Sequence, residues 1–435
     1  YKRQSIYYTI YFGGMTMGFL DNLIANSLGG SSFFNAPKKL YKFEKIKQLT
    51  HETIKKNPNI KLIDMGVGEP DKMADELICD VLNNECRKPE NRYYADNGIE
   101  EFQEAVCRYL NNVYGIENLT ISNVMHGIGS KSILAMIPIC FINPGDICIM
   151  PSPAYPTLGT YTKLLGGEIY NIPLCKENNF YMDLNSIPND ILKRAKMIYV
   201  NYPNNPTGQV ATYEFYKDIV DFAKKNNILV VSDLAYGHLT YDGYKPLSIL
   251  SVDGALDVCV EIHSMSKSFN MTGWRLAFVV GSEKFIKLFS SVKSHTDSGQ
   301  FRAIQKAGVF ALDNYHLVDI NRERYSRRLN LLTETLKEIG FEAKKPKAGF
   351  YIYVPIPKGV KDGIKFKTAE DATLYLLSNA LISTVPWDDC GSFLRFSVTY
   401  NADTIEEEIN IMNDLKNRLL SLNCLLYTSD AADDG

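Results

Sequence analysis

The chain has no apolar run that approaches the ~20 residues a membrane-spanning helix needs, so we expect no membrane span. Its six histidines show no HxxxH or HExxH spacing and its nine cysteines form no CxxC pair, so we expect no metal site. A net charge of −3 gives no reason to expect nucleic acid or an acidic membrane as a partner. Internal repeats and low-complexity segments are also absent. The 435 residues therefore predict an ordinary globular protein of two domains, or one large α/β unit with an appendage.

The cysteines are odd in number and scattered, and several lie inside apolar runs. This pattern is typical of reduced core thiols, so we expect a cytoplasmic protein, with an organelle-targeting leader as the open alternative. The nine are Cys79, Cys86, Cys107, Cys140, Cys148, Cys175, Cys259, Cys390 and Cys424.

Both ends of the chain differ in character from the rest. The chain begins with Tyr1, and the sequence MTM at residues 15–17 offers a natural start, so we interpret residues 1–16 as a non-native or disordered leader. A signal or transit peptide is the alternative for this stretch, although its apolar part is short and interrupted. Residues 424–435, CLLYTSDAADDG, follow an amphipathic helix predicted at residues 404–422, and we interpret them as a non-native tail.

Short apolar runs alternate with helical stretches between residues 123 and 281. Runs of this kind, with little polar alternation, are typical of a parallel sheet buried on both faces. Helices such as the one predicted at residues 212–226 separate them, which gives repeated βα units. We therefore predict an α/β fold with a seven-stranded, mostly parallel sheet flanked by helices. The predicted strands lie at residues 122–126, 146–150, 167–172, 197–201, 228–232, 258–262 and 276–280.

A second body follows the sheet in the sequence. Its predicted helices and strands indicate a smaller α+β domain, and they lie at residues 318–339, 350–354, 370–380 and 393–398. Residues 38–64 are expected to pack on this domain, because residues 61–65 predict a strand without a partner nearby. We divide the chain into an N-terminal arm with part of the small domain (17–75), a large domain (76–315) and the C-terminal part of the small domain (316–423).

The most informative motif is SMSKSFNMTGWR at residues 264–275. A surface lysine is the ordinary alternative for Lys267, but the hydroxyls of Ser264 and Ser266 and the apolar strand that follows favour a functional amine. An amine flanked by hydroxyls and a guanidinium fits a ligand with an aldehyde at one end and a phosphate at the other, such as pyridoxal phosphate (PLP). We predict that Lys267 is the catalytic residue, and that Arg275, Ser264 and Ser266 bind the phosphate.

Three more polar side chains follow predicted strands, at the edge where parallel sheets bind ligands. Asp233 could pair with the pyridine nitrogen of such a ligand, although an isolated Asp at a strand end is more often a helix cap. Tyr236 could reach the 3′-oxygen of the ligand. Asn205, within NYPNNPTG (201–208), could reach the same atom, with a plain turn as the alternative for that segment.

A glycine-containing turn, GIGSKS at residues 127–132, lies between a predicted strand and an apolar helix. Free N–H groups at a helix start bind anions, so Ser130 and Lys131 are candidates for a second phosphate clamp, although many strand–helix turns look alike. Tyr155, in PSPAYP (151–156), is a candidate to stack on the ring of the ligand, with an ordinary core tyrosine as the alternative.

These motifs together resemble those of the PLP-dependent aminotransferases of fold type I, class I and II, in the same order and at fitting intervals from about residue 17 to residue 422. The resemblance implies the PLP-transferase fold, a Schiff base on Lys267, and a homodimer with shared active sites. It also implies that Arg395, in FLRFSV (393–398), holds the substrate α-carboxylate. A surface salt bridge is the ordinary alternative for that arginine.

Finer motifs are similar to the LL-diaminopimelate aminotransferase branch of this family: DMGVGEPD (64–71), YADNG (94–98), HTDSGQ (295–300) and LISTVPWD (381–388). In that branch, positions matching Tyr41 and Gly68 contact substrate, and an acidic residue matching Asp96 is suited to the substrate's distal ammonium. A tyrosine from the neighbouring subunit reaches the phosphate, which here implies Tyr94, with Tyr93 as the alternative.

The resemblance implies transfer of an amino group from LL-2,6-diaminopimelate to 2-oxoglutarate, a step of lysine biosynthesis. The partners would then be a small amino acid and a 2-oxo acid. A broad-specificity aminotransferase for aspartate, alanine or aromatic amino acids is the main alternative, and a PLP lyase or decarboxylase is another. A PLP-sensing transcription regulator is disfavoured, because the segment before Tyr41 is too short and too weakly basic for a DNA-binding domain.

Overall fold

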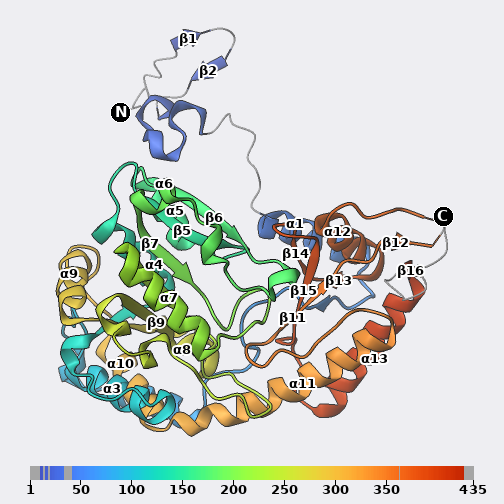
Figure 1. The fold of residues 1–435 in the computed structure, drawn as a ribbon. Coiled ribbons are helices and arrows are strands. Elements are labelled where there is room, and N and C mark those ends of the chain that lie inside the picture. The colour runs from blue at the N-terminus through green and yellow to red at the C-terminus, as the bar shows by residue number, and fades with distance from the viewer. Residues whose placement is uncertain (1–9, 13–14, 18–19, 34–41, 362, 426–435) are drawn as a thin grey trace, which may run out of the picture.

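The structure is a computed structural model that describes residues 10–12, 15–17, 20–33, 42–361 and 363–425. Figure 1 shows a larger body built on a broad sheet and, beside it, a smaller body that contains the C-terminal helices. A short antiparallel hairpin, β1 (Ile10–Phe12) and β2 (Met15–Met17), precedes both bodies.

The large body is organised around a seven-stranded sheet with the order β4-β10-β9-β8-β7-β5-β6. Strand β10 runs antiparallel to both of its neighbours, and the other neighbouring pairs are parallel. The prediction of a seven-stranded, mostly parallel sheet is therefore confirmed, with small shifts at the strand ends. The strands are β4 (Val124–Ile128), β5 (Ile147–Ser152), β6 (Glu168–Pro173), β7 (Ala195–Val200), β8 (Leu229–Asp233), β9 (Cys259–Ser264) and β10 (Leu276–Val280).

Apolar packing on both faces of this sheet explains why its strands lack polar alternation. Successive side chains of a strand point to opposite faces. In β7, Ile198 and Val200 join the apolar core on one face, whereas Met197 and Tyr199 join the core on the other. A continuous apolar run is therefore what a strand between two helical layers requires.

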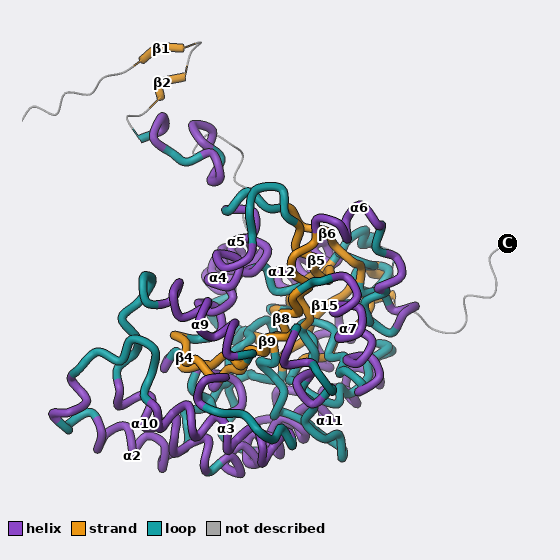
Figure 2. The backbone as a smooth tube through the Cα atoms, turned by 60° about the vertical axis from the view of Figure 1, so that its left-hand side comes forward, coloured by secondary structure: helices purple, strands orange, loops and turns teal. Residues whose placement is uncertain are grey.

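Helices cover both faces of the sheet. Helices α4, α5 and α9 pack on one face and α3, α7 and α10 on the other, as Figure 2 shows for α4, α9, α3 and α10. Among the described residues, no helix is long and apolar enough to cross a membrane. The helices of the large body are α2 (Glu76–Glu85), α3 (Glu100–Tyr114), α4 (Ser130–Phe141), α5 (Thr157–Leu164), α6 (Asn189–Arg194), α7 (Tyr213–Asn226), α8 (Met265–Ser268), α9 (Glu283–Lys293) and α10 (Arg302–Asp313).

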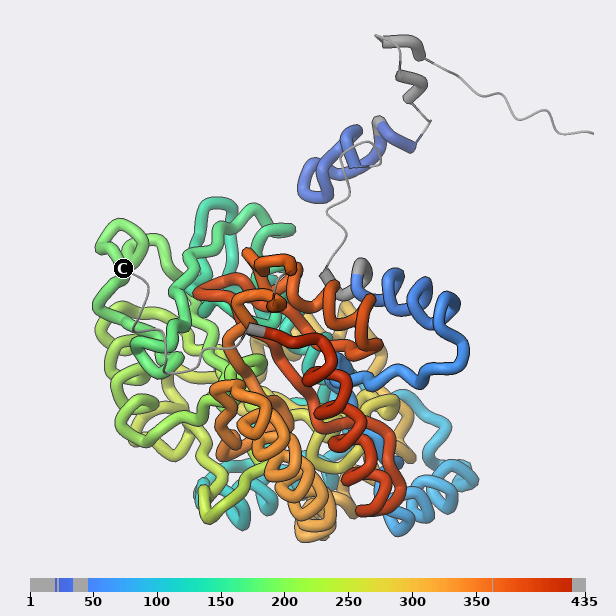
Figure 3. Tube along the Cα trace, turned by 90° about the vertical axis from the view of Figure 1, so that its right-hand side faces the viewer, coloured from blue at the N-terminus to red at the C-terminus, as the bar shows by residue number. Residues whose placement is uncertain are grey.

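The small body combines a three-stranded antiparallel sheet, in the order β11-β15-β14, with four helices. The long helices α11 and α13 run side by side on its outer surface, in orange and red in Figure 3. The elements are β11 (Tyr351–Pro355), β14 (Val385–Trp387), β15 (Phe393–Ser397), α1 (Lys42–Lys56), α11 (Asp319–Glu338), α12 (Ala369–Ala380) and α13 (Ile405–Ser421).

The N-terminal segment packs on this body, as the unpaired strand at residues 61–65 predicted. Strand β3 (Ile63–Asp64) pairs in parallel with β13 (Ile382–Ser383), and α1 packs against α12. The missing partner of the predicted strand therefore comes from the far end of the chain.

Two residues of the predicted C-terminal tail take part in the fold. Strand β16 (Cys424–Leu425) pairs antiparallel with β12 (Gly359–Val360). Cys424 and Leu425 therefore belong to the fold, and residues 426–435 of the predicted tail lie outside the described residues.

One cysteine pair departs from the expectation of reduced thiols. Cys175 and Cys390 form a disulfide with a Cα–Cα distance of 5.5 Å, across a sequence separation of 215 residues. The remaining seven cysteines are free. Cys175 follows β6 in the large body and Cys390 lies between β14 and β15 in the small body, so sequence spacing gave no sign of the pair.

Arg328, on α11, is the buried ionic centre of the small body. Its side chain is fully buried, and its Nε donates to Glu408 Oε1 of α13 at 2.7 Å. Its Nη2 donates to Asp71 Oδ2 at 3.1 Å. The guanidinium also donates to three backbone carbonyls, those of Val398, Tyr400 and Ala402. One side chain thus joins two helices, a loop and the N-terminal segment.

We expect the substitution Arg328→Met to lower the free energy of unfolding by about 3–5 kcal/mol, because Asp71 would stay buried without its hydrogen-bond partner and Glu408 would keep only Arg327. Chemical denaturation followed by circular dichroism measures this loss. Arg108→Met is the matched control, since Arg108 makes two 2.9 Å hydrogen bonds to Asp313 on the surface and should contribute less than about 1 kcal/mol. Equal small losses in both variants would contradict the role given to Arg328.

Candidate active site

A cavity of about 780 Å³ lies between the two bodies and collects most of the predicted site residues. Those that line it are Gly68, Ser130, Lys131, Tyr155, Asn205, Asp233, Tyr236, Ser264, Ser266, Lys267, Arg275 and Arg395. They come from segments spread over more than 300 residues of sequence, so the fold itself must bring them together.

The strand ends of the large sheet explain this convergence. Neighbouring parallel strands end at the same edge, where loops carry side chains into a shared crevice. Asp233 is the last residue of β8 and Ser264 the last residue of β9. Tyr155 and Asn205 follow β5 and β7, and Ser130 starts the helix after β4.

Lys267 is one of the residues that line the cavity. Its Nζ donates a hydrogen bond to the Gly68 carbonyl oxygen at 2.6 Å. Burial lowers the pKa of this amine to about 8; Glu69 opposes the shift, and the nearby guanidinium groups of Arg275 and Arg395 add to it. A lysine held in this way is partly neutral near physiological pH, which an amine nucleophile or proton carrier requires.

An anion-binding end is formed where α4 begins. Helix α4 has 12 residues, its first turn carries Ser130 and Lys131, and its N-terminal N–H groups and dipole favour a negative ligand. Gly129 precedes it with φ +77°, and a Cβ atom there would lie 2.1 Å from Arg275 Nη2. The glycine therefore lets the guanidinium approach the helix start. Such a cluster of donors is suited to a phosphate.

Asp233 forms a second polar feature, at the end of β8. Its Oδ2 accepts a hydrogen bond from the Tyr199 hydroxyl at 2.8 Å, while its Oδ1 is buried and has no hydrogen-bond partner among the described residues. Burial raises the pKa of Asp233 to about 6, against the hydrogen bond from Tyr199. A buried acceptor with a free oxygen is a site for a protonated ligand group.

Tyr236 and Asn205 reach the cavity from neighbouring loops. The Tyr236 hydroxyl lies 3.1 Å from that of Tyr351, and burial raises the pKa of Tyr236 well above its usual value. Asn205 Oδ1 accepts a hydrogen bond from Arg395 Nη1 at 2.9 Å, which leaves the side-chain nitrogen of Asn205, Nδ2, available as a donor. Both tyrosine and asparagine can thus donate to an oxygen of a ligand held near Lys267.

Arg395, on β15, brings the small body into the site. Its Nη2 donates to the Gly66 carbonyl at 2.8 Å, and its guanidinium lies over the Tyr351 ring, 4.1 Å from the centroid. Its Nε is buried and unpartnered among the described residues. A Cβ atom at Gly68 would lie 2.7 Å from the Tyr351 hydroxyl, so glycine is needed there for this tyrosine to sit below the arginine.

Two predicted site residues that the structure describes are not brought into the cavity. Tyr94 and Asp96 lie in an exposed loop, and Tyr94 is 79% exposed. Tyr93, the alternative to Tyr94, is 55% exposed in the same loop. Tyr41 lies outside the described residues.

Internal contacts hold that exposed loop in place. The buried amine of Lys293 donates to the Asp96 carbonyl at 2.8 Å, and Arg302 Nη2 donates to the Tyr94 carbonyl at 2.7 Å. Gly299 approaches so closely that a Cβ atom would lie 2.1 Å from the Ala95 carbonyl oxygen. These contacts hold the backbone and leave the side chains of Tyr94 and Asp96 facing outward.

Several residues at the site were not predicted from the sequence. Lys47, Asp64, Glu69, Tyr351 and Trp387 line the cavity, and Tyr199 lies behind Asp233. Tyr351 and Tyr199 belong to apolar strands, so their pattern indicated only a buried core. Asp64 and Glu69 carried a sequence signal, since both lie in the DMGVGEPD motif, and so did Trp387, which lies in LISTVPWD.

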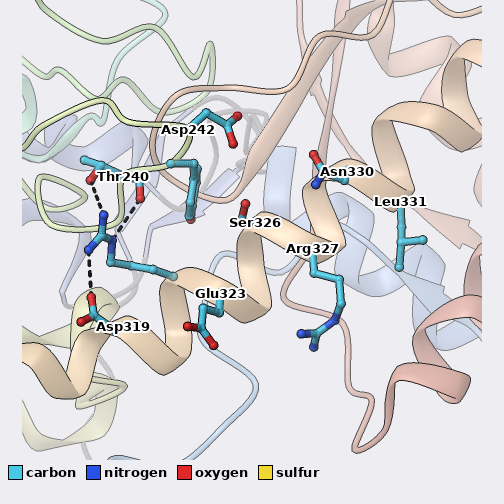
Figure 4. A pocket seen from close by; sticks show the side chains of 10 residues that line it. Thr240, Asp242, Asp319, Glu323, Ser326, Arg327, Asn330 and Leu331 are labelled. Carbon is cyan, nitrogen blue, oxygen red and sulfur yellow. Dashed lines mark hydrogen bonds and ion pairs between the residues drawn. The ribbon is translucent and has the colours of Figure 1, made fainter.

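A second hollow, between residues 240–242 and α11, lacks comparable chemistry (Figure 4). Arg322 there donates to the Thr240 carbonyl and to Asp319, and Arg327 is held by Glu408. Its cations are thus already bound within the protein. In the described part of the chain, no His, Cys, Asp and Glu side chains are grouped so as to hold a metal ion.

Comparisons with known proteins agree with this geometry. A family model for aminotransferase class I and II matches residues 60–411. LL-diaminopimelate aminotransferase of Methanocaldococcus jannaschii is 52% identical over 410 residues, covering 92% of this chain and 97% of the relative. The protein of the same name from Aquifex aeolicus is 37% identical over 382 residues, covering 86% and 96%.

Solved structures show the same architecture. Substrate-bound BacF from Bacillus subtilis matches with a TM-score of 0.81 at 30% identity, covering 90% of this chain and 98% of that one. A single mutant of Thermus thermophilus aspartate aminotransferase matches with a TM-score of 0.77 at 25% identity, covering 88% and 98%. The predicted fold is therefore confirmed.

The lowered pKa of Lys267 gives a test by chemical labelling. In protein freed of any bound ligand, Lys267 should become reactive as pH rises through about 8, because the neutral amine is the nucleophile. Competitive acetylation followed by peptide mass spectrometry measures the titration. Lys217 is the internal reference, since its hydrogen bond to Asp221 raises its pKa and it should react only at higher pH. Coincident profiles for the two lysines would contradict the assignment.

Proposed function

The chain belongs to the class I and II aminotransferase family, and we propose that it binds PLP at Lys267 and transfers the amino group of LL-2,6-diaminopimelate to 2-oxoglutarate. The observation that carries the proposal is that Lys267, an amine with a lowered pKa, shares one cavity with two anion-binding groups, Arg275 at the start of α4 and Arg395. Relatives named for LL-diaminopimelate, at 52% and 37% identity over most of the chain, support the choice of substrate.

The residues present fit PLP. Arg275 with the start of α4 would hold its phosphate, together with Lys131 and the hydroxyls of Ser130, Ser264 and Ser266. The unpartnered Oδ1 of Asp233 would accept from its protonated ring nitrogen, and Asn205 and Tyr236 would donate to its 3′-oxygen. Tyr155 would stack on its ring. When bound, PLP supplies an aldehyde that amines attack and a ring that accepts electrons.

Within this arrangement Arg395 orients the substrate. Two of its nitrogens already bind Asn205 and Gly66, so the guanidinium is held before a ligand arrives, and the unpartnered Nε remains for a carboxylate. A fixed guanidinium fork is suited to capture of a carboxylate. Because the amino acid and the 2-oxo acid both carry that group, one clamp serves both halves of the reaction, and the kinetics should be ping-pong.

Lys267 is then the proton carrier. With PLP bound, the amine of Lys267 would be placed to accept a proton from the substrate Cα and to give it back. Because burial lowers the pKa of Lys267 to about 8, a fraction of this amine is in the neutral, proton-accepting form at neutral pH. Transfer by a positioned acid–base group contributes typically ~10²–10⁴-fold to the rate.

We propose that a second copy of the chain binds the distal end of the substrate. We place Asp96 against the distal ammonium and Tyr94, or Tyr93 as the alternative, against the phosphate of a neighbouring subunit, in a homodimer with shared sites. Support comes from the exposed loop that carries these residues: its backbone is fixed by Lys293 and Arg302 while its side chains face outward.

A broad-specificity aminotransferase is the second candidate. Solved structures named for aspartate and aromatic aminotransferases share the fold at 25% and 26% identity. The cavity clamps every α-carboxylate in the same way, so the groups around Lys267 alone would also serve those substrates. A lyase on the same scaffold is a further alternative that activity assays would detect.

Reduction with borohydride tests the cofactor assignment. PLP should become fixed to the peptide that contains Lys267, and Lys267→Ala should retain little turnover while still binding PLP through its phosphate. Peptide mass spectrometry identifies the labelled lysine. Label on any other lysine would contradict the proposal.

Substrate choice is tested at Asp96. A desolvated, charge-assisted contact contributes roughly 1.5–3 kcal/mol, so Asp96→Asn should lower kcat/KM for LL-diaminopimelate by about 10–150-fold. Activity on alanine or aspartate should stay nearly unchanged, and these substrates are the control. An equal loss on all substrates would mean that Asp96 only shapes its loop, and would favour the broad-specificity candidate.

A further inference from the structure

A buried tyrosine, Tyr199, binds the carboxyl group of Asp233, which lines the cavity. Tyr199 is fully buried in β7, next to β8, and its side chain belongs to the apolar core on one face of the sheet. Its hydroxyl donates a hydrogen bond of 2.8 Å to Asp233 Oδ2. Among the residues that the structure describes, Asp233 is the only hydrogen-bond partner of this hydroxyl.

The two oxygens of Asp233 are therefore in different situations. Oδ2 is bound by Tyr199, whereas Oδ1 is buried and has no hydrogen-bond partner in the described part of the chain. Because Asp233 lines the cavity, the bond on Oδ2 sets the rotation of the carboxyl group and with it the direction of Oδ1. A buried acceptor without a partner is costly unless a ligand completes it.

We propose that Tyr199 is a positioning residue, which holds the carboxylate of Asp233 ionised and turned so that Oδ1 meets the ring nitrogen of the cofactor. The inference rests on the proposed function, because it assigns the ligand of Oδ1 to PLP. It adds a residue that acts through Asp233 without touching the cofactor or the substrate.

The electrostatics of the pair support this role. Burial raises the pKa of Asp233 to about 6, and the Tyr199 hydrogen bond is the largest influence that opposes the rise. The other influences are the backbone N–H of Ala235 and the ring of His263 on β9, which itself binds Glu261 at 2.9 Å. Tyr236 also faces the carboxyl group from the loop after β8.

Removal of the Tyr199 hydroxyl should therefore raise the pKa of Asp233. A hydrogen bond to a charged group is lost, which shifts the titration by about one pH unit or more, toward neutral pH. A protonated Asp233 cannot pair with a protonated ring nitrogen. As the pH is lowered, the variant without the Tyr199 hydroxyl should therefore begin to lose affinity for the cofactor at a higher pH than the wild-type protein does.

Tyr199→Phe is the variant of choice, because it keeps the ring in the core and deletes only the hydroxyl. Tyr216→Phe is the matched control: Tyr216 is equally buried, and its hydroxyl donates to a backbone carbonyl, that of Tyr202, at 3.0 Å. Thermal unfolding of both variants shows whether they fold alike. The measured quantity is the Kd for PLP between pH 5.5 and 8.5, with the absorbance of the bound cofactor as a second readout.

We expect Tyr199→Phe to weaken PLP about tenfold at pH 7, to shift the pH profile of the Kd upward by about one unit, and to lower kcat with little change in KM. Tyr216→Phe should leave the Kd and its pH profile as in the wild type. In an Asp233→Asn background, adding Tyr199→Phe should have no further effect on the Kd, because the group it acts on is already lost.

The outcomes separate this inference from the proposed function. If the wild-type chain binds PLP on Lys267 and Tyr199→Phe matches Tyr216→Phe in Kd and in pH profile, the positioning role is overturned and the proposed function stands. An equal loss caused by Tyr199→Phe with and without Asp233→Asn also overturns it, since the tyrosine would then act independently of Asp233. If the wild-type chain does not bind PLP, both are overturned.

Discussion

The site depends on one short segment, residues 64–71, whose backbone carbonyls are shared by the cations of both bodies. The Gly68 carbonyl accepts from Lys267 of the large body, and the Gly66 carbonyl accepts from Arg395 of the small body. The segment is anchored at one end by β3 pairing with β13, and at the other by Asp71 binding Arg328. A Cβ atom at Gly68 would lie 2.7 Å from the Tyr351 hydroxyl, so a larger residue there would have to displace that tyrosine. The segment thus offers main-chain acceptors that do not titrate to cations of both bodies, beside the side-chain contacts Arg395–Asn205 and Tyr236–Tyr351 that also join the bodies.

Local sequence signals were sufficient for the large sheet and for the residues at its strand ends. The runs that form β7 and β8 are apolar throughout because both faces are covered, and Asp233 and Lys267 stand out against that background. The edge at which they meet then follows from the rule that parallel strands end together. Lys267 could therefore be identified by its sequence context, and its position in the cavity agrees with that prediction.

Long-range pairings could not be predicted in the same way. Tyr199 and Tyr351 look like core residues of apolar strands, and only the packing of neighbouring elements shows that their hydroxyls bind Asp233 and Tyr236. The Cys175–Cys390 pair joins two bodies and has no spacing that marks it. The exposed loop with Asp96 was predicted from resemblance, and a single chain leaves that side chain outside the cavity. For the two tyrosines and the cysteine pair, the determining contact lies far away in sequence.

Burial shifts the pKa values of the two principal ionisable groups in opposite directions, and the shift at Lys267 favours proton transfer. Burial raises the pKa of Asp233 to about 6 and lowers that of Lys267 to about 8, so each group titrates closer to neutrality than it would in water. The charges near the lysine are of both signs, since Glu69 favours its protonated form whereas Arg275 and Arg395 disfavour it. Cations that face one another across a cavity repel, and this repulsion disfavours the folded state. A ligand with a phosphate at one end and a carboxylate at the other would remove that cost, so the arrangement that tunes the lysine also selects its ligands.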